Sequence, residues 1–361
     1  MSASRIYLDH AATTPVLPEA RAAVAEALGR WANPSSPHAD GRAAKAALED
    51  ARARIKAALG WTGDLIFTAT ATEAADLAFA RCRQQGPKPA LTTVEHDAIR
   101  TQVAEGEGFD LQVGSDGLLA PEALSSWLRM IPGGLVAVQH ANSETGVIQN
   151  IAAISEVVDL AGSYLLVDCA QTAGKLALPP ADLLIVSSSK VGGPPGAAAL
   201  LVRDLKLLVP SGGQERGYRR GTENLPAILG WAAALEARAW DMDRLGYLRG
   251  KLDSRLLLNG ARLVSGIIGR IPTIGAYAMD GMSAMAQLVR LDSLGFSVSA
   301  GSACSSGKTK TSHVLAAMGM DPDVADKVIR VSFGPSTSEN DVDRFAEAWS
   351  ALAAEARARA A

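Results

Sequence analysis

The sequence has little cysteine and no excess of charge of either sign. Cysteine occurs three times in 361 residues, at Cys82, Cys169 and Cys304, and no two of them form a CxxC pair. Such a small and odd number of cysteines argues against a disulfide framework and favours a reducing compartment. Lysine and arginine number 35 and aspartate and glutamate 38, so the net charge is −3. We therefore expect no nucleic-acid partner, because such binding needs a basic excess.

Long apolar runs and metal-ligand spacings are also lacking. No run approaches the ~20 residues that span a bilayer, and the stretch 197–202 is typical of the longest. The N-terminal residues show no apolar core of a secretory signal. The five histidines form no HxxxH or HExxH pattern, so we expect no metal site. These absences predict a cytoplasmic protein without a membrane partner.

What is present is the composition of a globular protein, with 48% apolar and 20% charged residues. At about 150 residues per domain, the length suggests two domains or one large domain with an appended lobe. Short apolar runs alternate with amphipathic helical patterns; the runs are 65–68, 90–94, 135–138, 164–168, 182–186 and 197–202. This alternation predicts an α/β fold whose sheet is mostly parallel and covered by helices on both faces. The C-terminal third is predicted to form a smaller α+β lobe that begins between residues 235 and 260.

Polar residues follow several of these runs. Asp168 ends one run, and Lys190 follows 22 residues later, after the next run. Ligands bind at the carboxyl ends of parallel strands, so both side chains are expected at a ligand site. The pair suits pyridoxal phosphate, because a lysine amine forms a Schiff base with it and an acid keeps its pyridine nitrogen protonated. The helix start at 70–73 would hold the phosphate, although taken alone it is better explained as an ordinary helix cap.

Three further residues each allow two interpretations. His96 follows an apolar run and either stacks on the cofactor ring or caps the next helix. Cys304 lies among small and polar residues, which suits a nucleophile better than a buried structural thiol. Arg330 has the planar fork that binds carboxylates, but on its own it is better explained by surface or packing roles. Cys82 and Cys169 are expected to be structural.

Many motifs together make the chain resemble the cysteine desulfurases of the class V aminotransferase family, which are pyridoxal-phosphate enzymes of fold type I. The motifs are YLDHAATTP (7–15), NPSSPHADGR (33–42), FTATATE (67–73), EH (95–96), HANSETGVIQ (140–149), VDCAQTAGK (167–175), SSSK (187–190), GGQERGYRRGTEN (212–224), GSACSSG (301–307), SHVLAAMG (312–319) and IRVSFGPST (329–337). The resemblance implies a mostly parallel central sheet sandwiched by helices. It implies a large cofactor-binding domain at residues 15–245 and a small α+β domain, made of 1–14 and 246–361, that carries the Cys304 loop.

The resemblance also implies a role for each matching residue. Lys190 looks like the Schiff-base lysine, Asp168 like the partner of the pyridine nitrogen, and Cys304 like the nucleophile that takes sulfur from L-cysteine. His96 is similar to the catalytic histidine that stacks on the cofactor, and Arg330 to the arginine that binds the substrate carboxylate. The remaining implied cofactor contacts are Gln171, Ala71, Thr72, Ser187, Ser189, Asn142, Ser143 and, from the second subunit of a homodimer, Thr222. The remaining implied substrate contacts are Asn33 and Asn142.

The implied reaction converts L-cysteine to L-alanine and leaves the sulfur on Cys304 as a persulfide. The length of the segment around Cys304 resembles the longer-loop group, which includes enzymes that feed iron–sulfur cluster assembly. A sulfur-acceptor or iron–sulfur scaffold protein is therefore an expected partner. One alternative is a selenocysteine lyase or a related lyase. Another is a non-catalytic paralogue that serves as a partner in a sulfur-transfer complex.

The chain departs from the family pattern at four positions, of which Ser189, Ser143 and Thr70 motivate the last alternative. Ser189 stands where the family usually has histidine, Ser143 where it has asparagine and Thr70 where it has glycine. Arg220 replaces a small residue in the segment before Thr222. We hypothesise that Arg220 supplies positive charge to a phosphate pocket that has lost its imidazole.

Overall fold

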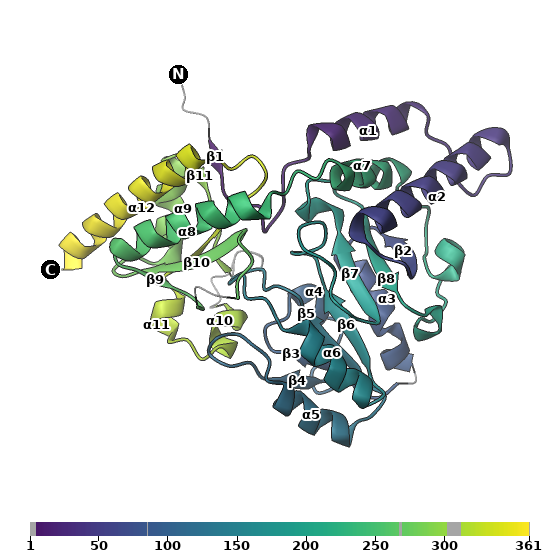
Figure 1. The fold of residues 1–361 in the computed structure, drawn as a ribbon, viewed down its shortest axis with the longest axis horizontal. Coiled ribbons are helices and arrows are strands. Elements are labelled where there is room, and N and C mark those ends of the chain that lie inside the picture. The colour runs from purple at the N-terminus through teal and green to yellow at the C-terminus, as the bar shows by residue number, and fades with distance from the viewer. Residues whose placement is uncertain (1–4, 85, 267–268, 302–311, 361) are drawn as a thin grey trace.

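The computed structural model describes residues 5–84, 86–266, 269–301 and 312–360 (Figure 1). Cys304 lies outside the described residues.

Among the described residues, the largest sheet has seven strands in the order β2-β8-β7-β6-β5-β3-β4. The strands are β2 (Asp64–Thr68), β3 (Ala90–Thr92), β4 (Phe109–Leu111), β5 (Leu135–Gln139), β6 (Tyr164–Asp168), β7 (Leu183–Ser187) and β8 (Ala198–Val202). The pairs from β4 through β3, β5 and β6 to β7 are parallel. The expectation of a mostly parallel central sheet is confirmed, and β4 is a strand that the sequence analysis did not predict.

Strand β8 runs antiparallel to both of its neighbours, β7 and β2. Only residues 188–197 separate β7 from β8. A connection between parallel strands needs a crossover of a dozen or more residues, usually with a helix. The short connection therefore makes β8 turn back beside β7, and β2, antiparallel to β8, again points the same way as β7.

Helices cover both faces of this sheet, as predicted. Their bounds are α1 (Pro18–Gly29), α2 (Ala39–Leu59), α3 (Ala71–Gln84), α4 (Asp97–Arg100), α5 (Pro121–Met130), α6 (Ile151–Leu160) and α7 (Leu225–Glu236). Leu65 and Phe67 of β2 pack with α2 and α7 on one face, whereas Ile66 packs with α3 on the other. Successive side chains of a strand point to opposite faces, so a sheet covered on both sides requires runs that are apolar throughout.

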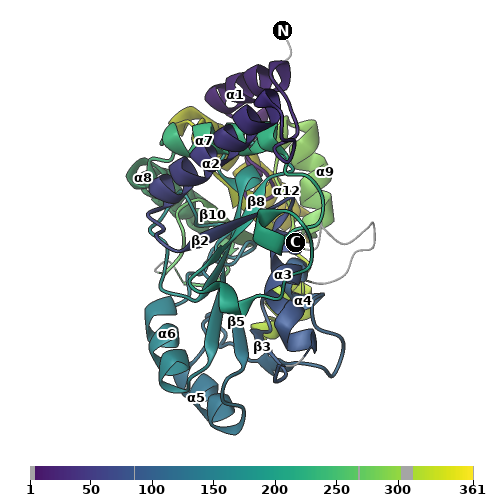
Figure 2. The same cartoon turned by 90° about the vertical axis from the view of Figure 1, so that its right-hand side faces the viewer.

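A second, antiparallel sheet has the order β12-β10-β9 within the described part of the chain. Its strands are β9 (Ala261–Leu263), β10 (Ile274–Met279) and β12 (Val328–Ser332), and the helices around it are α8 (Met242–Leu258), α9 (Ala284–Ser293), α10 (His313–Ala317), α11 (Pro322–Ala325) and α12 (Glu339–Ala360). Figure 1 shows this part beside the large sheet, and in Figure 2, turned by 90°, it lies behind that sheet. Phe345 and Trp349 of α12 are buried in its core.

The N-terminal segment joins this second part. Strand β1 (Ile6–Tyr7) pairs in parallel with β11 (Phe296–Ser297), and Leu8 lies in the same core as α8 and α12. The segment thus brings residues 9–14 between the two sheets. The domain limits at 14/15 and 245/246 stay a prediction.

Candidate functional site

A pocket of about 620 Å³ lies at the carboxyl ends of β2, β5, β6 and β7. The first turns of α3 and α4 form part of its wall. Ala11, Ala12 and Arg330, which are distant from these elements in the sequence, also line it. Parallel strands end at a common edge, so the polar residues that follow them meet there, as the sequence analysis expected.

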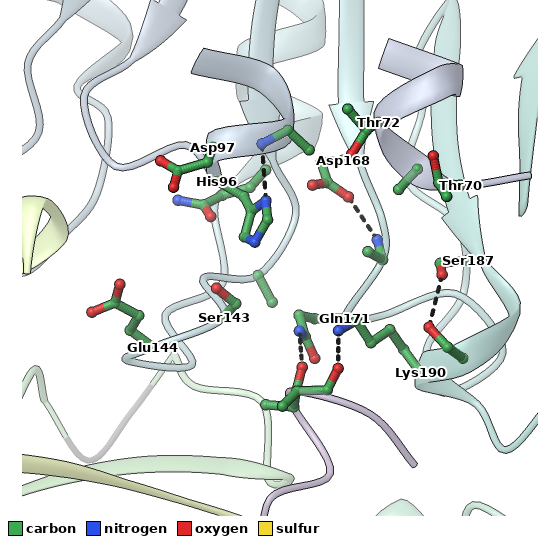
Figure 3. A pocket seen from close by; sticks show the side chains of 18 of the residues that line it. Thr70, Thr72, His96, Asp97, Ser143, Glu144, Asp168, Gln171, Ser187 and Lys190 are labelled. Atoms are coloured by element: carbon green, nitrogen blue, oxygen red, sulfur yellow. Dashed lines mark hydrogen bonds between the residues drawn. The ribbon is translucent and has the colours of Figure 1, made fainter. Parts of the chain in front are cut away.

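Asp168 and Lys190 project into this pocket from the ends of neighbouring strands (Figure 3). Asp168 is the last residue of β6, and its Oδ1 accepts a hydrogen bond from Ala170 N at 2.8 Å. Lys190 ends the short 3₁₀ turn after β7, and its Nζ donates to Ala12 O. Burial raises the pKa of Asp168, and the nearby His96 and Lys190 act in the opposite direction.

A second amine, which the sequence analysis did not single out, lies close to this pair. The Lys175 side chain is buried, with Nζ 4.2 Å from the centre of the Trp240 ring. Burial lowers the pKa of Lys175 to about 7, and the charge of Lys190 contributes to the shift. Burial, together with Lys175, also lowers the pKa of His10 to about 4. Only burial in the folded chain distinguishes Lys175 from a solvated lysine, so no local sequence signal identified it.

Both interpretations of His96 agree with its position. It caps α4, with Nδ1 accepting a hydrogen bond from Ala98 N at 3.0 Å, and it lines the pocket. A ring nitrogen that accepts an N–H bond carries no proton itself, so the proton of the neutral ring is on Nε2. Nε2 is therefore the nitrogen that remains for a ligand.

The residue before His96 is a buried carboxyl group. Glu95 Oε1 accepts hydrogen bonds from Thr92 Oγ1 at 2.5 Å and Gln139 N at 2.8 Å. Its other oxygen has no hydrogen-bond partner among the described residues. Burial raises the pKa of Glu95 to about 8. A protonated carboxyl group is thus the favoured state of this residue at neutral pH.

The start of α3 combines a helix cap with a pocket wall. Thr70 Oγ1 accepts a hydrogen bond from Glu73 N at 3.1 Å, and Glu73 Oε2 accepts one from Ala69 N at 2.6 Å. This is close to a capping box, so the ordinary cap interpretation is correct for Thr70. Ala71 and Thr72 line the pocket at the same helix end. The first N–H groups of a helix lack intrahelical partners and favour an anion.

Four other predicted cofactor contacts line the pocket: Gln171, Ser143, Ser187 and Ser189. Gln171 Nε2 donates to Ala11 O at 2.9 Å, whereas its buried Oε1 has no partner within the described chain. Ser187 and Ser189 place their hydroxyl oxygens 3.3 Å apart. A buried acceptor without a partner is available to a ligand that donates a hydrogen bond.

Arg330 reaches the pocket from β12. Its side chain is almost fully buried, while Ile329 and Val331 on either side belong to the apolar core. The guanidinium donates to Asp9 Oδ1 and to Ser143 O, both at 2.9 Å. Successive side chains of a strand point to opposite faces, so the position of Arg330 between two core residues directs it toward the pocket.

Other predicted site residues are not brought to the pocket of this chain. Asn142 is buried beside it, with Oδ1 accepting hydrogen bonds from Glu144 N and Thr145 N at 2.9 Å. Asn33 and Thr222 are not among the lining residues, and Thr222 is exposed. Arg220 is exposed too, with Nε donating to Ser211 O at 2.5 Å. The predicted nucleophile Cys304 lies outside the described residues.

The two described cysteines have the surroundings of structural residues. Cys169 is buried in the core under the large sheet, and burial raises the pKa of its thiol. Cys82 is half-buried in α3, where burial also raises the pKa. Thiols that are held protonated make poor nucleophiles.

Two further features are absent from the described residues. They contain no cluster of three or more His, Cys, Asp or Glu side chains that could hold a metal ion. In the same part of the chain, no helix has the length and apolar character to cross a membrane.

Comparisons with known proteins agree along nearly the whole length of the chain. The family model described as Aminotransferase class-V matches residues 6–345. Cysteine desulfurase IscS 1 of Archaeoglobus fulgidus is 33% identical, over 94% of this chain and 95% of that protein. The IscS-like cysteine desulfurase of Mycobacterium tuberculosis is 35% identical, over 97% of both. The crystal structure of a NifS-like protein from Rickettsia africae superposes with a TM-score of 0.89 at 29% identity, and covers 96% of this chain and 99% of that one.

Proposed function

This chain belongs to the class-V aminotransferase family and is a cysteine desulfurase that depends on pyridoxal phosphate, and we propose that it acts through Lys190, Asp168, Arg330 and Cys304. The observation that carries the proposal is the placement of Asp168 and Lys190 at adjacent strand ends in one pocket. Arg330 in the same pocket supplies the group that an amino-acid substrate needs.

The described residues fit pyridoxal phosphate. The orphaned Oε1 of Gln171 can accept a hydrogen bond from the phenolic hydroxyl group of the cofactor. Thr72 and Ser187 supply hydroxyl groups near the N-terminus of α3, which suits the phosphate. Asp168 supplies the acid for the pyridine nitrogen.

Pyridoxal phosphate, when bound, withdraws electrons from the substrate Cα. Lys190 would hold the cofactor through its amine and, once released, would move the proton at Cα. Asp168 would keep a proton on the pyridine nitrogen, and Arg330 would bind the substrate carboxylate. The Nε2 side of His96 faces the pocket as a second proton carrier. A scaffold without activity would need none of these groups together.

The sulfur step involves Cys304. Its thiolate attacks the sulfur of L-cysteine, so that an S–S bond forms and the bond between carbon and sulfur breaks. The carbon keeps the electron pair of the broken bond and takes up a proton to give L-alanine. The products are L-alanine and a persulfide on Cys304, and no external oxidant or reductant is consumed.

We further propose that the protein is a cytoplasmic homodimer that passes its sulfur to an acceptor or iron–sulfur scaffold protein. The IscS names of its relatives support iron–sulfur assembly. The exposed Thr222, outside the pocket of its own chain, supports a contribution from a second copy. The sparse cysteine content supports a reducing compartment.

The test is the release of alanine and sulfide from L-cysteine, with a thiol reductant present. Wild type is expected to release both in equal amounts. Cys304→Ala is expected to lose both by on the order of 10²-fold or more while keeping the cofactor absorbance, because the nucleophile is gone. Cys82→Ala, the matched control, should stay within about twofold of wild type. Undiminished alanine release by Cys304→Ala would reject the proposal.

A further inference from the structure

Helix α8 buries two charged side chains against the second sheet. Arg249 and Asp253, one helical turn apart, are each only 5% exposed. The hydroxyl group of Tyr277 on β10 joins them, because it donates a hydrogen bond to Asp253 Oδ1 at 2.5 Å and accepts one from Arg249 Nη1 at 2.8 Å. A hydroxyl group can do both at once. Burial raises the pKa of Tyr277 to about 12, so its proton stays in place at neutral pH.

The arginine of this buried network holds the strand that carries Arg330. Arg249 Nη2 donates a hydrogen bond to the carbonyl oxygen of Val331, the residue after Arg330 on β12, at 3.0 Å. Arg249 Nε donates to Pro272 O, also at 3.0 Å. The guanidinium carbon lies 3.9 Å from the centre of the Phe333 ring, a distance at which a cation and an aromatic face attract each other. Arg249 therefore fixes the backbone of β12 directly beside Arg330.

The carboxylate of the network holds a segment that pairs with residues near the pocket. Asp253 Oδ2 accepts a hydrogen bond from Arg270 Nη2 at 2.7 Å, and both side chains are buried. Arg270 forms an antiparallel bridge with Val147. Backbone hydrogen bonds on both sides of this bridge join residues 269–271 to residues 146–148. The placement of residues 146–148 is thus tied, through Arg270, to the Asp253 carboxylate.

The turn that follows β5 holds the guanidinium group of Arg330. Asn142 N donates a hydrogen bond to Val147 O at 2.9 Å and so closes residues 142–147 into a turn. Ser143 O, within this turn, accepts a hydrogen bond from Arg330 Nη1 at 2.9 Å. Ser143 lies at the wall of the pocket (Figure 3). Arg330 is therefore supported at two places, its backbone and its side chain.

We propose that Asp253 is a positioning residue that sets Arg330 for the substrate carboxylate, because both supports of Arg330 lead to it. One support is the backbone of β12, which Arg249 holds. The other is the turn 142–147, which is held through Arg270. The inference rests on the proposed function, because Arg330 needs a fixed position only if it binds L-cysteine. Ordering a binding group in advance lowers the cost of binding, so a loss of position weakens substrate binding.

Stability alone does not account for this network. Two buried guanidinium groups share one carboxylate, and Nε and Nη1 of Arg270 have no hydrogen-bond partner among the described residues. Replacing buried ionic groups with well-packed apolar side chains is often neutral or stabilising. What the ionic groups add here is direction, since each hydrogen bond fixes one backbone element relative to another.

The first experiment measures steady-state alanine release by the holoenzyme. Asp253→Asn keeps an oxygen for the Tyr277 hydroxyl group but loses the ion pair with Arg270. Tyr277→Phe keeps that ion pair but loses the link to Arg249. Each variant removes one support at nearly constant volume, so each is expected to raise KM for L-cysteine about fivefold and to leave kcat within about twofold.

A matched control and a double variant show where Asp253 acts. Asp343 pairs with Lys251 and Arg255 of the same helix α8 near the protein surface. Asp343→Asn should therefore keep KM within about twofold of wild type. In an Arg330→Lys background, Asp253→Asn should change KM by less than about twofold, because its effect passes through the arginine that is already altered.

The second experiment does not depend on activity. Amide hydrogen exchange is followed by mass spectrometry in the holoenzyme without L-cysteine. Ile148 N and Ile271 N form the backbone hydrogen bonds between the two paired segments. Asp253→Asn should exchange severalfold faster in the peptides that contain these two residues. Exchange in helix α6 should equal that of wild type, and Asp343→Asn should equal wild type throughout.

The outcomes separate this inference from the proposed function. If wild type releases no alanine, the proposed function fails, whereas the exchange rates still test the support of the turn. If Asp253→Asn matches wild type in KM and in exchange, the inference is wrong. It is also rejected if kcat falls while KM stays unchanged, or if the rise in KM persists in the Arg330→Lys background. Faster exchange in α6 as well would show general destabilisation and would likewise reject the positioning role.

Discussion

Arg330 Nη2 lies 2.9 Å from Asp9 Oδ1, although the two residues are 321 positions apart in the sequence. The N-terminal segment runs beside β12, where Ser332 N donates to Leu8 O at 2.8 Å. Asp9 balances the charge of a buried guanidinium whose Nε has no partner among the described residues. The arginine is therefore oriented toward the pocket before any substrate binds, which reduces the ordering cost of binding.

The first prediction concerns the carboxylate contact of Arg330. Arg330→Lys keeps the charge but loses the planar fork, so KM for L-cysteine should rise roughly tenfold to a hundredfold, with a smaller change in kcat. Steady-state kinetics of alanine release measures both constants. Arg262→Lys, an exposed arginine paired with Asp280 in the same sheet, is the control and should behave as wild type. An unchanged KM for Arg330→Lys would show that the carboxylate binds elsewhere.

The second prediction concerns the two neighbouring amines. Reduction of the holoenzyme with borohydride should attach the cofactor to Lys190, which lines the pocket, and not to the buried Lys175, which does not. Mass spectrometry of the tryptic peptides identifies the modified residue. Lys190→Ala should give no modified peptide and no alanine release. Modification of Lys175 in wild type would contradict the assignment.

The third prediction concerns the pH dependence of stability. The pKa of Glu95 is raised by burial from 4.5 to about 8. The native state thus holds a proton that the unfolded chain releases, and this contribution to stability is complete below pH 4.5 and lost as the pH rises to about 8. Glu95→Gln has no such group, so its stability relative to wild type should rise with pH by at most about 1.4 kcal/mol per pH unit.

Denaturant unfolding at several pH values between these limits measures the difference. The amide oxygen that Glu95→Gln introduces can accept the hydrogen bonds of Thr92 and Gln139, so the variant is expected to fold. Glu105→Gln, at an exposed position, is the control. Parallel stability curves for wild type and Glu95→Gln would mean that Glu95 is ionised in the native protein.

The fourth prediction concerns the exposed loop of Arg220 and Thr222. If a second copy brings this loop to the phosphate, Arg220→Ser should weaken the affinity for pyridoxal phosphate by about tenfold, because one charge-assisted contact is lost. Titration of the apo protein with the cofactor measures the dissociation constant. Arg359→Ser, at the exposed end of α12, is the control. An unchanged affinity for Arg220→Ser rejects the idea that Arg220 compensates for a lost imidazole.

Local patterns predicted the elements that position the site. The runs before Asp168 and Lys190 are apolar throughout because helices cover both faces of the sheet. Such continuous apolar runs can be recognised in a single sequence. The direction of β8 was not predicted as a separate feature, since it depends on the length of one connection. Asn142 is a site residue whose role the sequence did not reveal. The family resemblance implied that it contacts cofactor and substrate, whereas in the structure its side chain orders a turn and does not line the pocket.

By itself, the sequence determined which chemical groups follow the strands, because strand and helix periodicities extend over only a few residues and can be read directly. Only the tertiary structure decided that Ala12 meets Lys190, that Asp9 meets Arg330, and that Glu144 meets Ser312. These contacts join residues more than 150 positions apart. No local pattern specifies them, because they form only when the two sheets and the N-terminal segment pack together.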